Sequence, residues 1–85
     1  MFLHLGADTV IPLSNVITIT DLRVEKKGIN DEFLKLMSEE NLICDISEGN
    51  GKSFIVTDKL VYLSPISAST LKKRAQFLSE EENEG

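Results

Sequence analysis

Three consecutive basic residues, Lys72, Lys73 and Arg74, are the side chains in this sequence best suited to bind a charged ligand. Lysine and arginine neutralise the phosphates of nucleic acids, and they also pair with acidic groups of proteins. The chain around them is acidic, with a formal net charge of −5 over 85 residues. Because positive charge is concentrated in one short stretch, we expect this stretch to meet a polyanion.

The basic stretch lies in a predicted helix, which begins after a serine cap at Ser67 or Ser69 and runs through roughly Leu78. Its apolar residues recur at helical spacing and form one stripe. Arg74 lies beside that stripe, so its aliphatic stem can pack there with its guanidinium at the rim, whereas the two lysines point away. The competing interpretation is a solvated helix face with one packed arginine.

Further lysines are expected in the loops of the fold. Lys52 follows a predicted turn, and Lys26 and Lys27 lie in a polar connection. If an oligomer gathered these loops on one face, repetition would multiply a modest charge, and binding to double-stranded DNA grows with the number of phosphates neutralised. The predicted DNA-binding residues are therefore Lys26, Lys27, Lys52, Lys72 and Lys73.

Catalytic and metal-binding patterns are weak in this chain. The only histidine, His4, and the only cysteine, Cys44, do not have the spacing of metal ligands, and two ligands make an incomplete zinc site. Residues 48–53, EGNGKS, end like a phosphate-binding loop, but Ile46 stands where its first glycine is required and a strand is predicted after it. We therefore expect no enzyme, no metal and no cofactor.

The predicted strands and helices form one small α+β domain over residues 1–78. An acidic tail over residues 79–85 follows it and is expected to be disordered. β-Branched and apolar runs predict strands over residues 2–5, 9–13, 15–20, 42–47, 52–57 and 60–64. A helix is predicted over residues 30–41. The expected architecture is a small, mostly antiparallel sheet with a central helix and a C-terminal helix.

Two turns are predicted within this sheet. Asn50-Gly51 tolerates the positive φ angles of a tight hairpin turn, and Asp58-Lys59 forms a short turn between the last two predicted strands. Pro12 cannot donate a backbone hydrogen bond, so it suggests an edge or a bulge between two short strands.

The last predicted strand contains Leu60, Val61, Tyr62 and Leu63 without alternation between apolar and polar residues. A strand with one solvated face should alternate, so this strand is expected to be covered on both faces. One interpretation is an oligomer interface formed by these four residues. The other is that the two helices pack on opposite faces of the sheet, and the sequence favours neither.

The cell compartment follows from three absences in the sequence. No apolar run approaches the length of about 20 residues that a membrane span requires, and the amino terminus lacks a basic segment and a cleavage site. A single cysteine cannot form an internal disulfide. We expect a cytoplasmic protein without a membrane partner.

Two stretches, HLG at residues 4–6 and LSPISASTLKKRAQF at residues 63–77, resemble the extracellular matrix regulatory proteins of spore-forming bacteria, the RemA and RemB family. The resemblance covers nearly the whole chain and is closest to the RemB branch. It implies a cytoplasmic DNA-binding regulator of biofilm matrix genes. It also implies a ring-like homo-oligomer with a fold similar to LytTR-type DNA-binding domains.

The resemblance is incomplete at the DNA-contacting positions. RemA-type proteins carry an arginine pair in the hairpin turn and another arginine before the second long strand, and these align with Gly49, Asn50 and Asn15 of this chain. Only Lys52 matches a nearby basic position. Two hypotheses follow: an oligomer that binds double-stranded DNA, and an oligomeric protein–protein adaptor whose basic helix meets an acidic partner.

Overall fold

The computed structural model describes residues 1–22 and 29–83, and within them it confirms the α+β class. Every predicted strand and helix is found, with bounds that differ by a few residues. In chain order the elements are β1 (Phe2–Gly6), β2 (Thr9–Pro12), a short 3-10 turn η1 (Leu13–Asn15), β3 (Val16–Asp21), α1 (Ile29–Glu39), β4 (Ile43–Asp45), β5 (Ser53–Thr57), β6 (Val61–Ser64) and α2 (Ala68–Asn83).

The strands form two sheets where the sequence predicted one. β1 and β2 form an antiparallel hairpin, and the other four strands form a sheet in the order β3–β5–β6–β4. In this sheet only β4 is parallel to its neighbour, β6, so mostly antiparallel pairing is confirmed. Pro12 ends β2 and η1 follows it, so the chain leaves the hairpin there and β3 pairs with β5 instead.

The predicted hairpin turn at Asn50-Gly51 is wrong. β6 lies between β4 and β5, so residues 46–52 form a loop that passes beyond a neighbouring strand. The residues with positive φ angles in this loop are Glu48 and Gly49. The turn at Asp58-Lys59 is confirmed, since β5 pairs with β6 around it.

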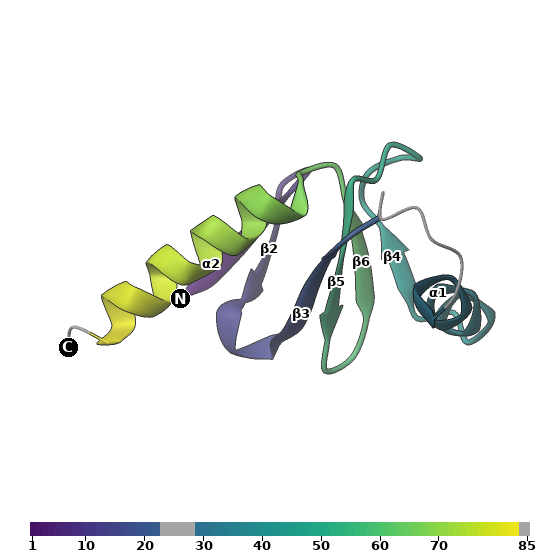
Figure 1. Ribbon diagram of the computed structural model, residues 1–85, viewed down its shortest axis with the longest axis horizontal. Coiled ribbons are helices and arrows are strands. Elements are labelled where there is room, and N and C mark those ends of the chain that lie inside the picture. Colours follow the sequence, from purple (N-terminus) through teal and green to yellow (C-terminus); the bar gives the residue numbers. More distant parts are fainter. Residues whose placement is uncertain (23–28, 84–85) are drawn as a thin grey trace.

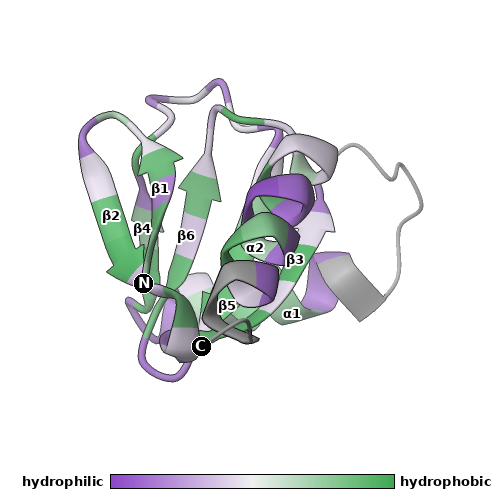
Figure 2. Ribbon diagram, turned by 90° about the vertical axis from the view of Figure 1, so that its left-hand side faces the viewer, coloured by the Kyte–Doolittle hydropathy of each residue, from purple (hydrophilic) through white to green (hydrophobic). Residues whose placement is uncertain are grey.

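Figure 1 shows the four-stranded sheet between two layers, with α1 on one side and the hairpin with α2 on the other. The main core lies between the hairpin, the sheet and α2, and its buried residues are Leu3, Leu5, Ile11, Ile55 and Leu71. Figure 2 shows hydrophobic residues along β1, β2 and β6. On the other face of the sheet, the ring of Phe33 on α1 lies 6.3 Å from that of Phe54 on β5.

α2 begins at a serine cap and continues beyond its predicted end. The Ser67 hydroxyl accepts a hydrogen bond from the backbone N–H of Thr70 at 3.2 Å, so Ser67 is the cap of the two serines considered. The helix reaches Asn83, five residues past Leu78. Its glutamate-rich end favours helix formation by intrinsic propensity. That residues 79–85 are disordered in solution stays a prediction.

Gly6 ends β1 with a φ angle of +102° and lies against the connection from β6 to α2. A Cβ atom at this position would lie 3.1 Å from Cγ of Pro65. We expect Gly6→Ala to lower the free energy of unfolding by about 1–3 kcal/mol, through backbone strain and this close contact. Urea denaturation measures the change.

Gly49→Ala is the matched control for Gly6→Ala. Gly49 also has a positive φ angle, 88°, but an added Cβ atom would meet no atom within 4 Å. Its substitution therefore introduces strain without the contact. Equal losses of stability in the two variants would show that the contact of the added Cβ atom with Pro65 costs nothing beyond the backbone strain.

Candidate functional site

The basic stretch of α2 is held against the core by its apolar stripe. Leu71 is fully buried, and Ala75 and Leu78 pack against the core cluster. Arg74 is exposed, and its Nη1 donates a hydrogen bond to the backbone oxygen of His4 on β1 at 3.3 Å. The expected position of Arg74 beside the stripe is confirmed, and its hydrogen bond connects α2 with β1.

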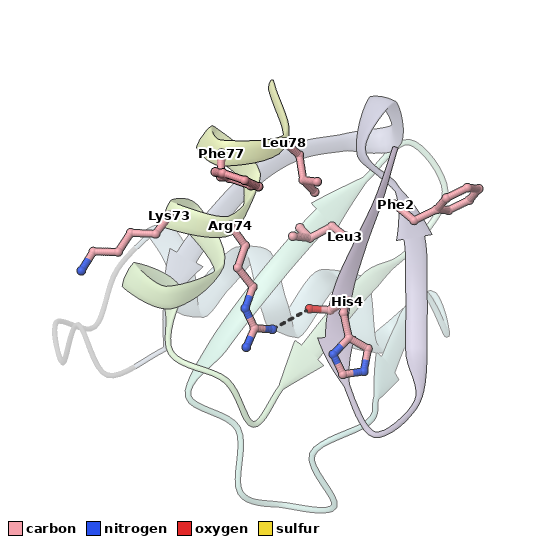
Figure 3. A pocket seen from close by; sticks show the side chains of 7 residues that line it. All are labelled: Phe2, Leu3, His4, Lys73, Arg74, Phe77 and Leu78. Carbon is pink, nitrogen blue, oxygen red and sulfur yellow. Dashed lines mark hydrogen bonds between the residues drawn. The ribbon is translucent and has the colours of Figure 1, made fainter. Parts of the chain in front are cut away.

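Lys72 and Lys73 are both exposed to solvent, on the part of α2 that the sequence analysis placed away from the stripe. Neither lysine forms an ion pair within the part of the chain that the structure describes. Their ammonium groups are therefore available to an external anion. Figure 3 shows the side chain of Lys73 extending away from β1.

Lys52 is brought close to the start of α2 by the sheet. Its backbone N–H donates to the oxygen of Ser64, the last residue of β6, at 2.8 Å. The hydroxyl of the next residue, Ser53, donates to the oxygen of Ile66 at 2.7 Å. Since these bonds join the start of β5 to the connection that enters α2, the exposed Lys52 lies at the same end of the sheet as the first turn of α2.

The remaining predicted DNA contacts, Lys26 and Lys27, lie outside the described residues. The positions aligned with the RemA-type arginines are described. Gly49 and Asn50 are exposed in the loop between β4 and β5, and Asn15 is half-buried at the end of η1. An arginine pair at residues 49 and 50 would therefore lie in the same loop as Lys52. In this chain, those two positions hold uncharged residues.

This loop begins with a local hydrogen-bonded turn at Asp45. The carboxylate of Asp45 accepts hydrogen bonds from the backbone N–H of Ser47 at 2.8 Å and from its hydroxyl at 2.5 Å. The hydroxyl bond is the main cause of a pKa of Asp45 below its ordinary value, and the backbone bonds lower it further. The turn fixes the start of the segment that leads to Lys52.

The lowered pKa of Asp45 predicts a pH-dependent contribution to stability. The folded state favours the carboxylate, so the contribution is complete above the unfolded-state pKa and disappears as the pH falls through the folded-state pKa. We expect Asp45→Asn to destabilise the protein more at neutral pH than at a pH below the carboxyl range. Urea denaturation at both pH values measures this.

Ser47→Ala provides the control for this pH effect, because it removes the hydroxyl that donates to Asp45. In the Ser47→Ala background, the pH dependence of the Asp45→Asn effect should become smaller. An unchanged pH dependence would mean that another group causes it.

The predicted oligomer interface is largely covered within one chain. Val61 is 2% exposed, and Leu60, Tyr62 and Leu63 are half-buried. Tyr62 packs against the main core, whereas Val61 belongs to the opposite face of the sheet, which α1 covers. Elements of the same chain therefore cover both faces of this strand, which was one of the two interpretations of its apolar sequence. The oligomer interface stays a prediction.

The residues considered for catalysis or metal binding are not brought together into a site. Within residues 1–22 and 29–83, no group of three or more histidine, cysteine, aspartate or glutamate side chains could hold a metal ion. His4 is exposed on β1 and Cys44 is half-buried on β4. Ser53, the last residue of the sequence resembling a phosphate-binding loop, begins strand β5 and not a helix. No helix among the described residues is long and apolar enough to cross a membrane.

The charges of the two helices are distributed differently: α1 has an excess of acidic residues, whereas α2 has three basic residues followed by three glutamates. The exposed charged residues of α1 are Asp31, Glu32, Lys35 and Glu39, so that helix is acidic. The exposed charges in the first two turns of α2 are Lys72, Lys73 and Arg74. Figure 1 shows the two helices on opposite sides of the sheet, toward the two ends of the long axis. The end of the molecule at α1 is therefore acidic, and the basic cluster lies in the first turns of α2, before the glutamate-rich part that reaches the other end.

A surface groove that was not predicted from the sequence lies between β1 and α2. The groove has a volume of about 480 Å³ and is lined by Phe2, Leu3, His4, Lys73, Arg74, Phe77 and Leu78. Phe2 is 64% exposed and Phe77 is 59% exposed, an unusual exposure for aromatic rings. The sequence held one sign of this groove: neither phenylalanine belongs to the set of apolar residues that faces the core in its own element. Only the fold, however, places β1 beside α2.

Comparisons with known proteins agree with one another. A family model described as RemA-like, extracellular matrix regulatory protein A-like, matches residues 2–75. The chain is also 40% identical over 80 residues to extracellular matrix regulatory protein B of Bacillus subtilis (strain 168), which covers 94% of this chain and 96% of that protein. The matched region includes every described element from β1 to the basic stretch of α2.

Proposed function

This chain belongs to the RemA-like family of extracellular matrix regulatory proteins, and we propose that it regulates matrix genes as an oligomer that binds double-stranded DNA through lysine–phosphate contacts. The family is one of regulatory proteins and not of enzymes. The resemblance to the RemB branch, expected from residues 4–6 and 63–77, is confirmed by the similarity to protein B.

One observation carries the proposal of DNA binding: exposed lysines from two distant parts of the sequence lie around the junction of the sheet with α2. Lys52 is connected to this junction by its backbone, and Lys72 and Lys73 follow one turn into the helix. Lysines arranged in this way neutralise phosphates and position a protein on the duplex without reading its sequence. Specificity would then come from the spacing of several copies or from DNA shape.

The proposed oligomer follows from the small number of cations in each chain. Three lysines give weak affinity for a duplex, and several copies on one DNA molecule give more. A ring of LytTR-like subunits in the cytoplasm, as the resemblance implies, belongs to this proposal.

The experiment that tests the proposal is fluorescence anisotropy of a labelled DNA duplex titrated with the full chain at low and at physiological salt. Saturable binding that weakens steeply with salt is expected, because each lysine contact releases counterions from the duplex. Absence of binding at low salt by protein shown to be folded would contradict the proposal. The missing arginines would then be decisive, and the adaptor hypothesis would take its place.

A further inference from the structure

The groove between β1 and α2, hereafter the β1–α2 groove, has features that phosphate binding does not require. Its apolar residues come from both elements: Phe2 and Leu3 from β1, and Phe77 and Leu78 from α2. Figure 3 shows Leu3 of β1 and Leu78 of α2 pointing toward one another, with Phe77 beside Leu78 on α2. Such a surface suits a large apolar side chain, which gains free energy as it leaves water.

Charge is the second feature of the β1–α2 groove. Its charged residues are Lys73 and Arg74, and none of its lining residues carries a carboxylate. Arg74 crosses from α2 toward β1 and uses Nη1 to contact the backbone oxygen of His4. This bond fixes the guanidinium at the groove, while its other donors make no hydrogen bond or ion pair with a described residue. A guanidinium held in this way suits a carboxylate, which it can bind with two parallel hydrogen bonds.

We propose that the β1–α2 groove binds a short acidic segment of a protein partner, with a large apolar side chain between Leu3, Phe77 and Leu78 and a carboxylate on Arg74. The open form of the groove, between a strand and a helix at the surface, admits an extended segment from one side. A DNA duplex is too wide for it and has no apolar side chain to place there. This binding site goes beyond the proposed DNA contacts, with which it shares only Lys73.

The chain offers matched variants for a test. Arg74→Gln removes the carboxylate-binding group, and Phe77→Ser removes an apolar wall, while both positions are exposed and should tolerate substitution. Lys72→Gln is the control, because Lys72 lies on the same helix and carries the same charge but does not line the groove. Circular dichroism of each variant establishes that it folds.

The probe is a library of short random peptides displayed on phage and selected on the full chain. Selected peptides should combine aspartate or glutamate with a phenylalanine or leucine. A selected peptide, synthesised with a fluorophore, should bind about tenfold more weakly to Arg74→Gln and to Phe77→Ser, and less than about twofold more weakly to Lys72→Gln. Loss of a charge-assisted hydrogen bond or of an apolar contact accounts for effects of this size.

Several results would overturn the proposal. Selection of no peptides, or of peptides without acidic and apolar residues, would do so directly. An equal loss of affinity in Lys72→Gln would indicate diffuse charge attraction. Displacement of the peptide by a short single-stranded oligonucleotide would assign the groove to nucleic acid, whose bases stack on aromatic rings. A lower mass of Phe77→Ser than of the unmodified chain in light scattering would assign it to a second copy of the chain.

Discussion

The double variant Lys72→Glu/Lys73→Glu is expected to lose DNA binding by about tenfold or more at low salt, with a shallower dependence of affinity on salt. Both side chains are exposed and form no ion pair with the described part of the chain, so their replacement removes phosphate contacts without opening the core. Charge reversal adds repulsion from the remaining phosphates. Anisotropy titrations at several salt concentrations measure both the affinity and its slope.

The matched control for this prediction is Lys35→Glu/Lys59→Glu. These lysines are also exposed, and their substitution changes the net charge of the chain by the same amount. Lys35 lies on α1 and Lys59 in the turn between β5 and β6, away from the junction that carries Lys52. If both double variants reduced affinity equally, overall charge and not the position of Lys72 and Lys73 would govern binding. Unchanged binding by the first variant would exclude those two residues as contacts.

Leu71→Ala is expected to destabilise the protein by about 2–5 kcal/mol, which is a large share of the stability of a small domain. Leu71 is fully buried and belongs to the core cluster formed with the hairpin and β5. Its truncation removes apolar contacts and leaves a cavity under α2. Urea denaturation followed by circular dichroism measures the change in free energy.

Lys72→Ala is the control for Leu71→Ala, because it lies at the next position of the same helix and is exposed. Its effect on stability should stay within about 0.5 kcal/mol. A small effect of Leu71→Ala would mean that the site collapses around the smaller side chain. DNA binding by the folded fraction of Leu71→Ala should remain, since the variant keeps all of the lysines.

The predicted elements agree with the structure wherever local pattern decides. β-Branched runs, a serine cap and apolar residues at helical spacing each act through neighbours in sequence, so β3, β5 and α2 were predictable. The prediction failed at Asn50-Gly51 for a reason of topology. A turn-forming dipeptide indicates a change of direction, but not whether the strands on its two sides pair, and here β6 lies between them.

The arrangement of the candidate site also depends on contacts between segments that are distant in the sequence, so a local pattern predicts only part of it. The exposed lysines of α2 follow from the apolar stripe around Leu71, which a helical projection predicts. That Lys52 lies at the same end of the sheet as the start of α2 depends on the hydrogen bonds from Lys52 to Ser64 and from Ser53 to Ile66, and no pattern in the sequence specifies those. The β1–α2 groove is likewise formed by residues more than sixty positions apart, of which the hydrogen bond between Arg74 and His4 is one contact.

The sequence by itself determined the α+β class, the family and the exposed position of Lys72 and Lys73, since these depend on composition, local periodicity and motif. Only the tertiary structure decided that the strands divide into two sheets, that β6 is covered on both faces within one chain, and that β1 and α2 enclose a groove. These features arise because apolar faces from distant segments pack together to leave water, and that choice of partners is a property of the whole chain.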